Sequence, residues 1–178
     1  MFQLDKAQAQ IANVNQRVER HGDERARAVD IKFTLSANNT LLDQFDKELR
    51  KFLFRKPAKG EQPQLPTIGI DSLTEVKFPS LEPQRLAHEF SGCELQIDGQ
   101  LDGTAPIVLV DVKLKKFVAE PKEGGSVDLS FTASATVDAD ELAEVSEAWI
   151  REDVVLSVGP GKKAAQNDPE QHELPDAA

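Results

Sequence analysis

Hydrophobic and polar residues alternate along much of the chain, as they do in strands that bury one face. The clearest example runs from residue 29 to residue 35, where every second residue is apolar. Apolar residues at positions 11, 14 and 18 predict an earlier strand whose register slips. A turn at residues 21–23 (His-Gly-Asp) would join these two strands into a long hairpin.

Between residues 40 and 56 the apolar spacing changes to three and four, which predicts a helix. Thr40 and Asp43 have the spacing of a capping box at its start, and Pro57 would end it. The apolar face of this helix consists of Leu42, Phe45, Leu49, Phe52 and Leu53.

The second half of the chain returns to alternation. Residues 86–90 and 93–97 lie on either side of Ser91-Gly92, which predicts a second hairpin with a two-residue turn. A well-buried strand begins at Pro106 and continues to Leu114. Alternation resumes at residues 127–135, so the run between these last two strands is either a hairpin tip or a ligand-binding loop.

That run contains Gly124-Gly125, and we interpret it as a hairpin tip. A phosphate-binding loop needs a helix after its glycines, whereas another strand follows here. Glu120 and Glu123 would also repel a phosphate. After the hairpin, a helix capped by Asp138 or Asp140 and a last short strand at residues 154–158 are predicted.

Strand runs with interspersed helices predict an α+β fold, an antiparallel sheet built from hairpins with two helices. We expect one domain over residues 1–158, with an irregular connection at 57–84 inside it. Residues 159–178 lack an apolar pattern and are expected to form a disordered acidic tail. Exposed edge strands in such a sheet would allow a homodimer.

Composition and charge restrict the function. The single cysteine, Cys93, fits a reducing compartment, and neither a signal peptide nor a membrane span is predicted, so we expect a cytoplasmic protein that binds no membrane. The formal net charge is −10. An acidic surface repels polyanions, so a basic protein is the expected partner.

Candidate catalytic and metal-binding residues are few. His88 and Cys93 fall in one predicted hairpin, where a cysteine–histidine pair would be a nucleophile, but we favour a hydrogen-bonded core histidine and a small buried thiol. The carboxylates near Asp138 lack the spacing of a calcium loop. We therefore predict no enzyme activity, no catalytic residue, no cofactor and no metal.

Two charged surfaces are the remaining candidates. The basic one interleaves cations with aromatics, as single-stranded nucleic acid requires, although a helix C-terminus also favours cations. It consists of Arg50, Lys51, Phe54, Arg55 and Lys56. The acidic one is either a solvated helix face or a docking surface for a basic partner. It consists of Asp138, Asp140, Glu141, Glu144, Glu147, Glu152 and Asp153.

The chain also resembles a family of small uncharacterised bacteriophage and prophage proteins. The resemblance rests on two segments, VDIKFTLSANNTLLDQFDKELRKFLFRK and LKKFVAEPKEGGSVDLSF, and covers about residues 1–158. It implies expression in a bacterial host cell and identifies no functional residue. Small acidic phage proteins often bind and block a host machine, including defence nucleases.

Three functional hypotheses follow. The first is a non-enzymatic phage protein that binds and modulates a nucleic-acid-binding host protein through its acidic surface, as an anti-defence, anti-CRISPR-like inhibitor. The second is an accessory of phage recombination or replication that binds single-stranded nucleic acid through the basic surface. The third is a minor component of the virion.

Overall fold

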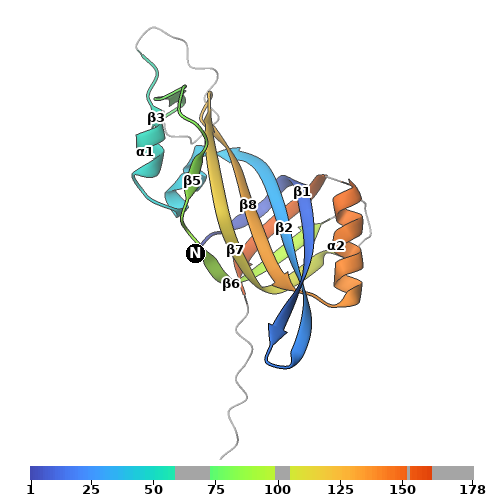
Figure 1. The fold of residues 1–178 in the computed structure, drawn as a ribbon. Helices are drawn as coiled ribbons and strands as arrows, with labels where there is room; N and C mark the ends of the chain where they lie inside the picture. Colours follow the sequence, from blue (N-terminus) through green and yellow to red (C-terminus); the bar gives the residue numbers. More distant parts are fainter. Residues whose placement is uncertain (59–72, 99–104, 152, 162–178) are drawn as a thin grey trace, which may run out of the picture.

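The structure is a computed structural model that describes residues 1–58, 73–98, 105–151 and 153–161. Six antiparallel strands close into a barrel, and a seventh strand is attached to it (Figure 1). Strands account for 59% of the structure and helices for 17%. The predicted α+β class is therefore wrong: the protein is mostly β, and its helices are small additions to a closed barrel.

The barrel strands are β1 (Leu4–His21), β2 (Glu24–Asn38), β6 (Phe90–Asp98), β7 (Ile107–Lys122), β8 (Ser126–Thr136) and β9 (Asp153–Pro160). Their order around the barrel is β7-β6-β9-β1-β2-β8, and pairing of β7 with β8 closes the ring. The extra strand β5 (Gln84–Leu86) pairs with β7. Two short strands, β3 (Phe54–Arg55) and β4 (Glu75–Val76), form a separate sheet.

Bulges bend the long strands enough to close the barrel. Lys6, Asp111 and Lys116 have positive φ angles of 44°, 52° and 58°. The ladders containing these three residues shift register beside them. Because a bulge adds a residue to one strand and increases its local twist, the bulged strands curve round until β7 meets β8.

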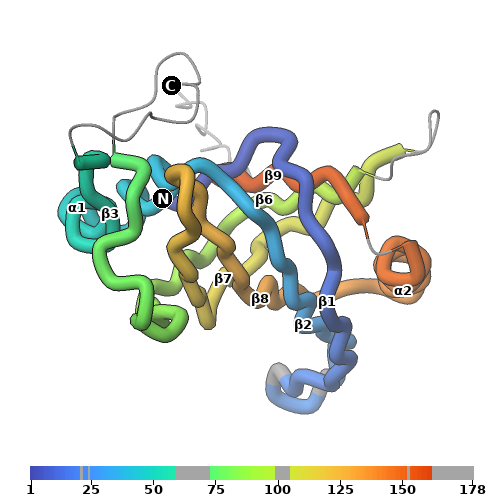
Figure 2. The backbone as a smooth tube through the Cα atoms, turned by 90° about the horizontal axis from the view of Figure 1, so that it is seen from above, coloured from blue at the N-terminus to red at the C-terminus, as the bar shows by residue number. Residues whose placement is uncertain are grey.

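Alternating side chains fill the barrel interior. Phe2, Phe33, Phe117 and Phe131 are fully buried or nearly so, between 0% and 1% exposed. The ring centroid of Phe2 lies 5.2 Å from that of Phe117 and 5.8 Å from that of Phe131. This aromatic cluster, together with the aliphatic residues of all six strands, forms one continuous core. The tube in Figure 2 traces the strands that surround it.

The predicted helix at residues 40–56 is wrong in extent. A 3-10 helix, η1 (Asn39–Gln44), is followed by one short α-helix, α1 (Leu49–Leu53). Asn38, rather than Thr40, caps η1, because its side chain accepts a hydrogen bond from the Thr40 amide. The Asp46 carboxylate accepts from the Glu48 amide at 2.7 Å, and this local turn interrupts the helical path.

The predicted hairpin at residues 86–97 is also wrong. Gly92 has a φ of +68° and lies within β6, where the ladder to β7 shifts register, so it forms an irregularity and not a turn. β5 pairs with β7 instead of with β6. The hairpin at the glycine pair is confirmed, since Lys122 pairs with Ser126 across it.

The remaining helix and the first hairpin agree with expectation. β1 and β2 pair from Gln10↔Thr34 to His21↔Glu24, with a register shift between Ile11 and Asn13. The helix α2 (Ala139–Arg151) packs against β1, β9 and β7 at one side of the barrel (Figure 2). No helix in the described ranges is both long enough and apolar enough to cross a membrane.

Candidate binding surfaces

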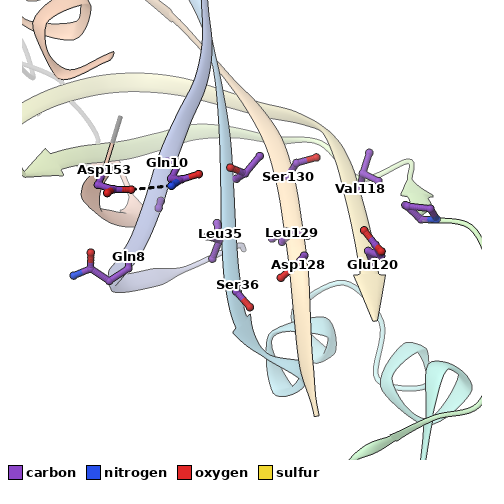
Figure 3. Close-up of a pocket in the computed structure, with 13 residues that line it drawn as sticks. Gln8, Gln10, Leu35, Ser36, Val118, Glu120, Asp128, Leu129, Ser130 and Asp153 are labelled. Atoms are coloured by element: carbon purple, nitrogen blue, oxygen red, sulfur yellow. Dashed lines mark hydrogen bonds between the residues drawn. The ribbon is translucent and has the colours of Figure 1, made fainter. Parts of the chain in front are cut away.

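Two hollows lie on the outer face of β1, β2, β8 and β7. Two neighbouring pockets of about 680 and 790 Å³ share Val118 and Ser130, so they form one continuous groove. Figure 3 shows the first pocket, with β2 and β8 as its floor. At one wall the Gln10 side chain donates to the Asp153 carboxylate at 2.9 Å. This hydrogen bond joins two residues that are also partners in the ladder between β1 and β9.

Charge divides this groove into two ends. The first pocket carries Glu120, Asp128 and Asp153, and the second carries Lys32, Arg85, Lys116, Asp30 and Glu89. Serine, threonine, glutamine and asparagine side chains line much of the surface between them. Such a surface can hydrogen-bond a polar ligand, but its acidic end opposes a nucleic acid backbone.

Asp30 is the most strongly connected charge in the groove. Its carboxylate accepts from the Ser134 hydroxyl and from Arg17 Nε (3.2 Å), and Lys115 Nζ lies 3.6 Å away. Burial alone would raise the pKa of Asp30, but the Ser134 hydrogen bond and the two cations outweigh burial and lower it. This network joins β1, β2, β7 and β8, so we assign it a structural role.

His88 and Cys93 do not form a catalytic pair in this structure. Cys93 is 0% exposed inside the barrel, and burial raises the pKa of its thiol. His88 is exposed on the outside, against the rings of Phe45 and Phe90. The barrel wall therefore separates a protonated thiol from an exposed imidazole.

The described residues contain no group of three or more histidines, cysteines or carboxylates that could hold a metal ion. The carboxylates at the start of α2 have local partners instead. Asp138 Oδ1 accepts from the amides of Asp140 and Glu141, and Glu141 Oε2 accepts from the Asp138 amide at 2.9 Å. This reciprocal arrangement is a capping box, so two of the seven predicted acidic residues stabilise the helix end.

The predicted basic surface is largely paired with carboxylates. Arg50 contacts Asp43 at 3.0 Å, Lys51 contacts Glu48 at 3.0 Å and Arg55 contacts Glu75 at 2.6 Å. The hydrogen bond from Arg55 lowers the pKa of Glu75.

The aromatic part of that surface is divided. Phe54 is 0% exposed and cannot stack on a base from this position. Lys56 is exposed. Phe52 is 54% exposed and contacts Phe78.

The acidic surface presents an exposed stripe along α2. Asp140, Glu144 and Glu147 follow one another at i, i+4 and i+7, which places them on one side of the helix. Among the described residues only Glu147 has a recorded cation partner, Arg151 at 3.5 Å. We call these three residues the acidic stripe. Of the other predicted members, Asp153 contacts Gln10, and Glu152 lies outside the described residues.

One exposed apolar side chain lies beside the acidic stripe. Ile150 is 81% exposed and follows Glu147 by three residues, which places it next to the stripe. Trp149 is 40% exposed, but it follows Asp140 by about two and a half helical turns and therefore lies on the opposite side of the helix. Ile150 therefore adds apolar area to the acidic surface.

Sequence reasoning missed one charged feature. Arg20, Arg25 and Arg27 lie on the projecting end of the β1–β2 hairpin, and all three are exposed. The signal was present, because arginine recurs at positions 25 and 27 with alanine between them. The cross-strand partners that bring Arg20 to the same face were not visible in the local pattern.

The fold and its surfaces define a closed antiparallel barrel that carries a hairpin arm and an acidic helix on its outside. Comparison of the chain with family models, with curated proteins and with solved structures finds no match. The charged surfaces of the molecule are therefore the basis on which a function can be assigned.

Proposed function

We propose that this chain is a non-enzymatic binding protein whose helix α2 docks on a basic surface of another protein. The observation that carries the proposal is the acidic stripe, Asp140, Glu144 and Glu147, with Ile150 exposed beside it. Like charges at i, i+4 destabilise an isolated helix, and a cationic partner relieves that repulsion. Charge complementarity would also speed the encounter.

The class of partner follows from the chemistry. Arginine and lysine clusters that could meet three carboxylates are the groups with which proteins bind nucleic acid. A chain that covers such a cluster would compete with the nucleic acid. In the phage setting that the sequence resemblance implies, this competition would inhibit a host defence nuclease or a related machine in the bacterial cytoplasm.

Binding of single-stranded nucleic acid through the predicted basic surface has less support. Three of its cations contact carboxylates, and its central aromatic, Phe54, is buried. The polar groove could hold a peptide, but its charges are divided between both signs. No observation favours the virion hypothesis.

Charge reversal within α2 tests the proposal. Affinity capture from bacterial lysate would compare the wild type with Glu144→Lys/Glu147→Lys. The matched control is Glu82→Lys/Asp111→Lys, which reverses two exposed acids elsewhere. We expect a protein that the wild type and the control retain but the α2 variant loses. Once purified, that protein should release bound nucleic acid when the chain is added. If the α2 variant captures the same proteins as the wild type, the proposal is overturned.

A further inference from the structure

A two-stranded arm projects from the barrel close to the start of α2. β1 pairs with β9 only as far as Gln10, and β2 pairs with β8 only from Ala28 onward. Residues 16–27 therefore form a ribbon in which β1 and β2 pair only with each other, and it extends beyond the barrel in Figure 1. At its base the Val137 amide donates to the Arg27 carbonyl at 3.0 Å, which joins the arm to the segment that leads into α2.

The strand register sorts the charges of this arm. The cross-strand pairs Arg20↔Arg25 and Val18↔Arg27 are two residues apart, so their side chains share one face. Glu19 lies between them in β1 and faces the other way, where it pairs with Arg17. We call Arg20, Arg25 and Arg27, together with Val18, the arginine face.

The arginine face is exposed and has no carboxylate partner among the residues that the structure describes. All three guanidinium groups lie on exposed residues, and no ion pair is recorded for them within the described part of the chain. Val18 is 66% exposed between them. The arginine face therefore offers three positive charges and one exposed aliphatic side chain. The acidic stripe offers three negative charges, with the exposed aliphatic side chain of Ile150 beside it.

The two surfaces also match in spacing. Successive side chains on one face of a strand are about 6.6 Å apart. Carboxylates at i, i+4 and i+7 of a helix are separated by about 6 and 4.5 Å along its axis. Two arginines of the arginine face can therefore each bind one carboxylate of the stripe at the same time. Each guanidinium group can donate two parallel hydrogen bonds to its carboxylate.

We infer that the arginine face binds the acidic stripe of a second copy of this chain, giving a two-fold symmetric dimer. The inference rests on the proposed function, because it assigns a basic partner to the same helix. The ribbon base and the start of α2 are adjacent, so a two-fold axis near Arg27 and Val137 brings each ribbon to the other copy's helix. Every contact then occurs twice.

A second copy fits the arginine face better than a nucleic acid does. The chain carries a net charge of −10, and α2 with its carboxylates begins beside the ribbon. Both features repel a polyanion near the arm. The exposed side chains of Val18 and Ile150 would be buried in a protein interface, whereas a phosphate backbone offers them no apolar contact.

Sedimentation velocity on the full chain, up to about 100 µM, tests the dimer. We expect the wild type to self-associate and the association to weaken as salt rises toward about 0.5 M, because exposed charges are then screened. Arg20→Glu/Arg25→Glu and, separately, Glu144→Arg/Glu147→Arg should each weaken self-association at least about tenfold. The control Lys47→Glu reverses an exposed cation elsewhere and should leave it unchanged.

Mixing the two variants gives the decisive result. In the mixed pair the glutamates of one ribbon face the new arginines of the other helix, while the second interface keeps its original charges. We expect a heterodimer from an equimolar mixture of two chains that are each monomeric alone. This result would also show that both variants fold. A monomeric wild type, a ribbon variant that still dimerises, or a mixture that fails to associate would each overturn the inference.

Failure here is distinguishable from failure of the proposed function. The ribbon variant keeps the acidic stripe, so it should still capture the basic partner, and more of it because no second copy covers α2. If the ribbon variant captures that partner while the wild type is monomeric, the proposed function stands and the dimer is overturned. Binding of a duplex DNA probe by the wild type, lost on Arg20→Glu/Arg25→Glu, would instead assign the arginine face to nucleic acid.

Discussion

At the scale of single residues, burial separates the aromatic side chains that stabilise the barrel from those on its surface. Phe2 is 0% exposed and contacts four other phenylalanine rings, whereas Phe52 is 54% exposed and contacts one. The sequence placed Phe52 on a buried helix face and did not predict a core role for Phe2. The reason is that Phe2 lies outside β1, which begins at Leu4, so it belongs to no alternating run of residues.

Truncation should reproduce this difference. Phe2→Ala should lower the free energy of unfolding by about 3–5 kcal/mol, through lost burial and the cavity left behind. Phe52→Ala, the matched control, should cost less than about 1 kcal/mol, since the ring is half exposed. Urea denaturation measures both. Equal losses would contradict the packing described here.

Asp30 should make stability depend on pH. Its pKa is lowered in the folded state, so its contribution is present above the ordinary aspartate pKa and is lost as pH falls through the folded value. Asp30→Asn should lower the free energy of unfolding by about 1–3 kcal/mol at pH 7. The difference from wild type should shrink as the pH falls below 3.8, the ordinary pKa of an aspartate side chain. A difference that is constant from pH 7 to acid would contradict the ion-pair network.

At the scale of elements, the sequence pattern predicted correctly those helices and hairpins that form between residues close together in the chain. The β1–β2 and β7–β8 hairpins join neighbours in sequence, and α2 begins at Ala139, directly after its predicted cap Asp138. The 86–97 hairpin failed because β5 pairs with the more distant β7 and Gly92 is an irregularity inside β6. The helix at 40–56 failed because the Asp46 side chain bonds the backbone and turns the chain.

The cap of α2 gives a test at this scale. Asp138→Ala removes the acceptor of two backbone amides and should cost about 1 kcal/mol. Asp140→Ala, two residues on, removes a carboxylate that accepts no recorded hydrogen bond and should cost about half as much or less. Thermal unfolding followed by circular dichroism distinguishes them. A larger loss for Asp140 would contradict the capping geometry.

The acidic stripe should carry a small cost in stability. Glu144→Gln removes a like-charge neighbour of Asp140 and Glu147, so it should raise the free energy of unfolding by about 0.2–0.5 kcal/mol. The same variant should bind a basic partner less well. Gain in stability with loss of binding is expected of a functional surface, whereas loss of both would indicate a structural role for Glu144.

At the scale of the whole molecule, closure of the barrel is the feature that sequence patterns did not reveal. It depends on pairing of β1 with β9 and of β2 with β8, and on bulges such as that at Lys116. Residues that pair across more than 100 positions leave no local periodicity. The candidate acidic surface was predictable because a helix stripe is local, whereas the arginine face needed the register of two strands.

Closure also changes which surfaces are available. In an open sheet, unpaired edge strands would be the natural place for another chain to bind. Within the barrel each of the six strands has a neighbour on both sides, so among the described barrel strands unpaired backbone edges remain on the ribbon of residues 16–27, outside the ring. The barrel itself is therefore left to recognise partners through side-chain surfaces. This is why the charged helix and the charged ribbon carry the functional argument.

Carboxyl-group footprinting by mass spectrometry tests the central claim most directly, because it measures the reactivity of individual carboxylates with a carbodiimide label. With the captured partner bound, we predict that labelling of Asp140, Glu144 and Glu147 falls severalfold, while labelling of Glu82 and Asp111 stays unchanged. Unchanged labelling of the acidic stripe, or protection confined to the groove residues Glu120 and Asp128, would contradict the account.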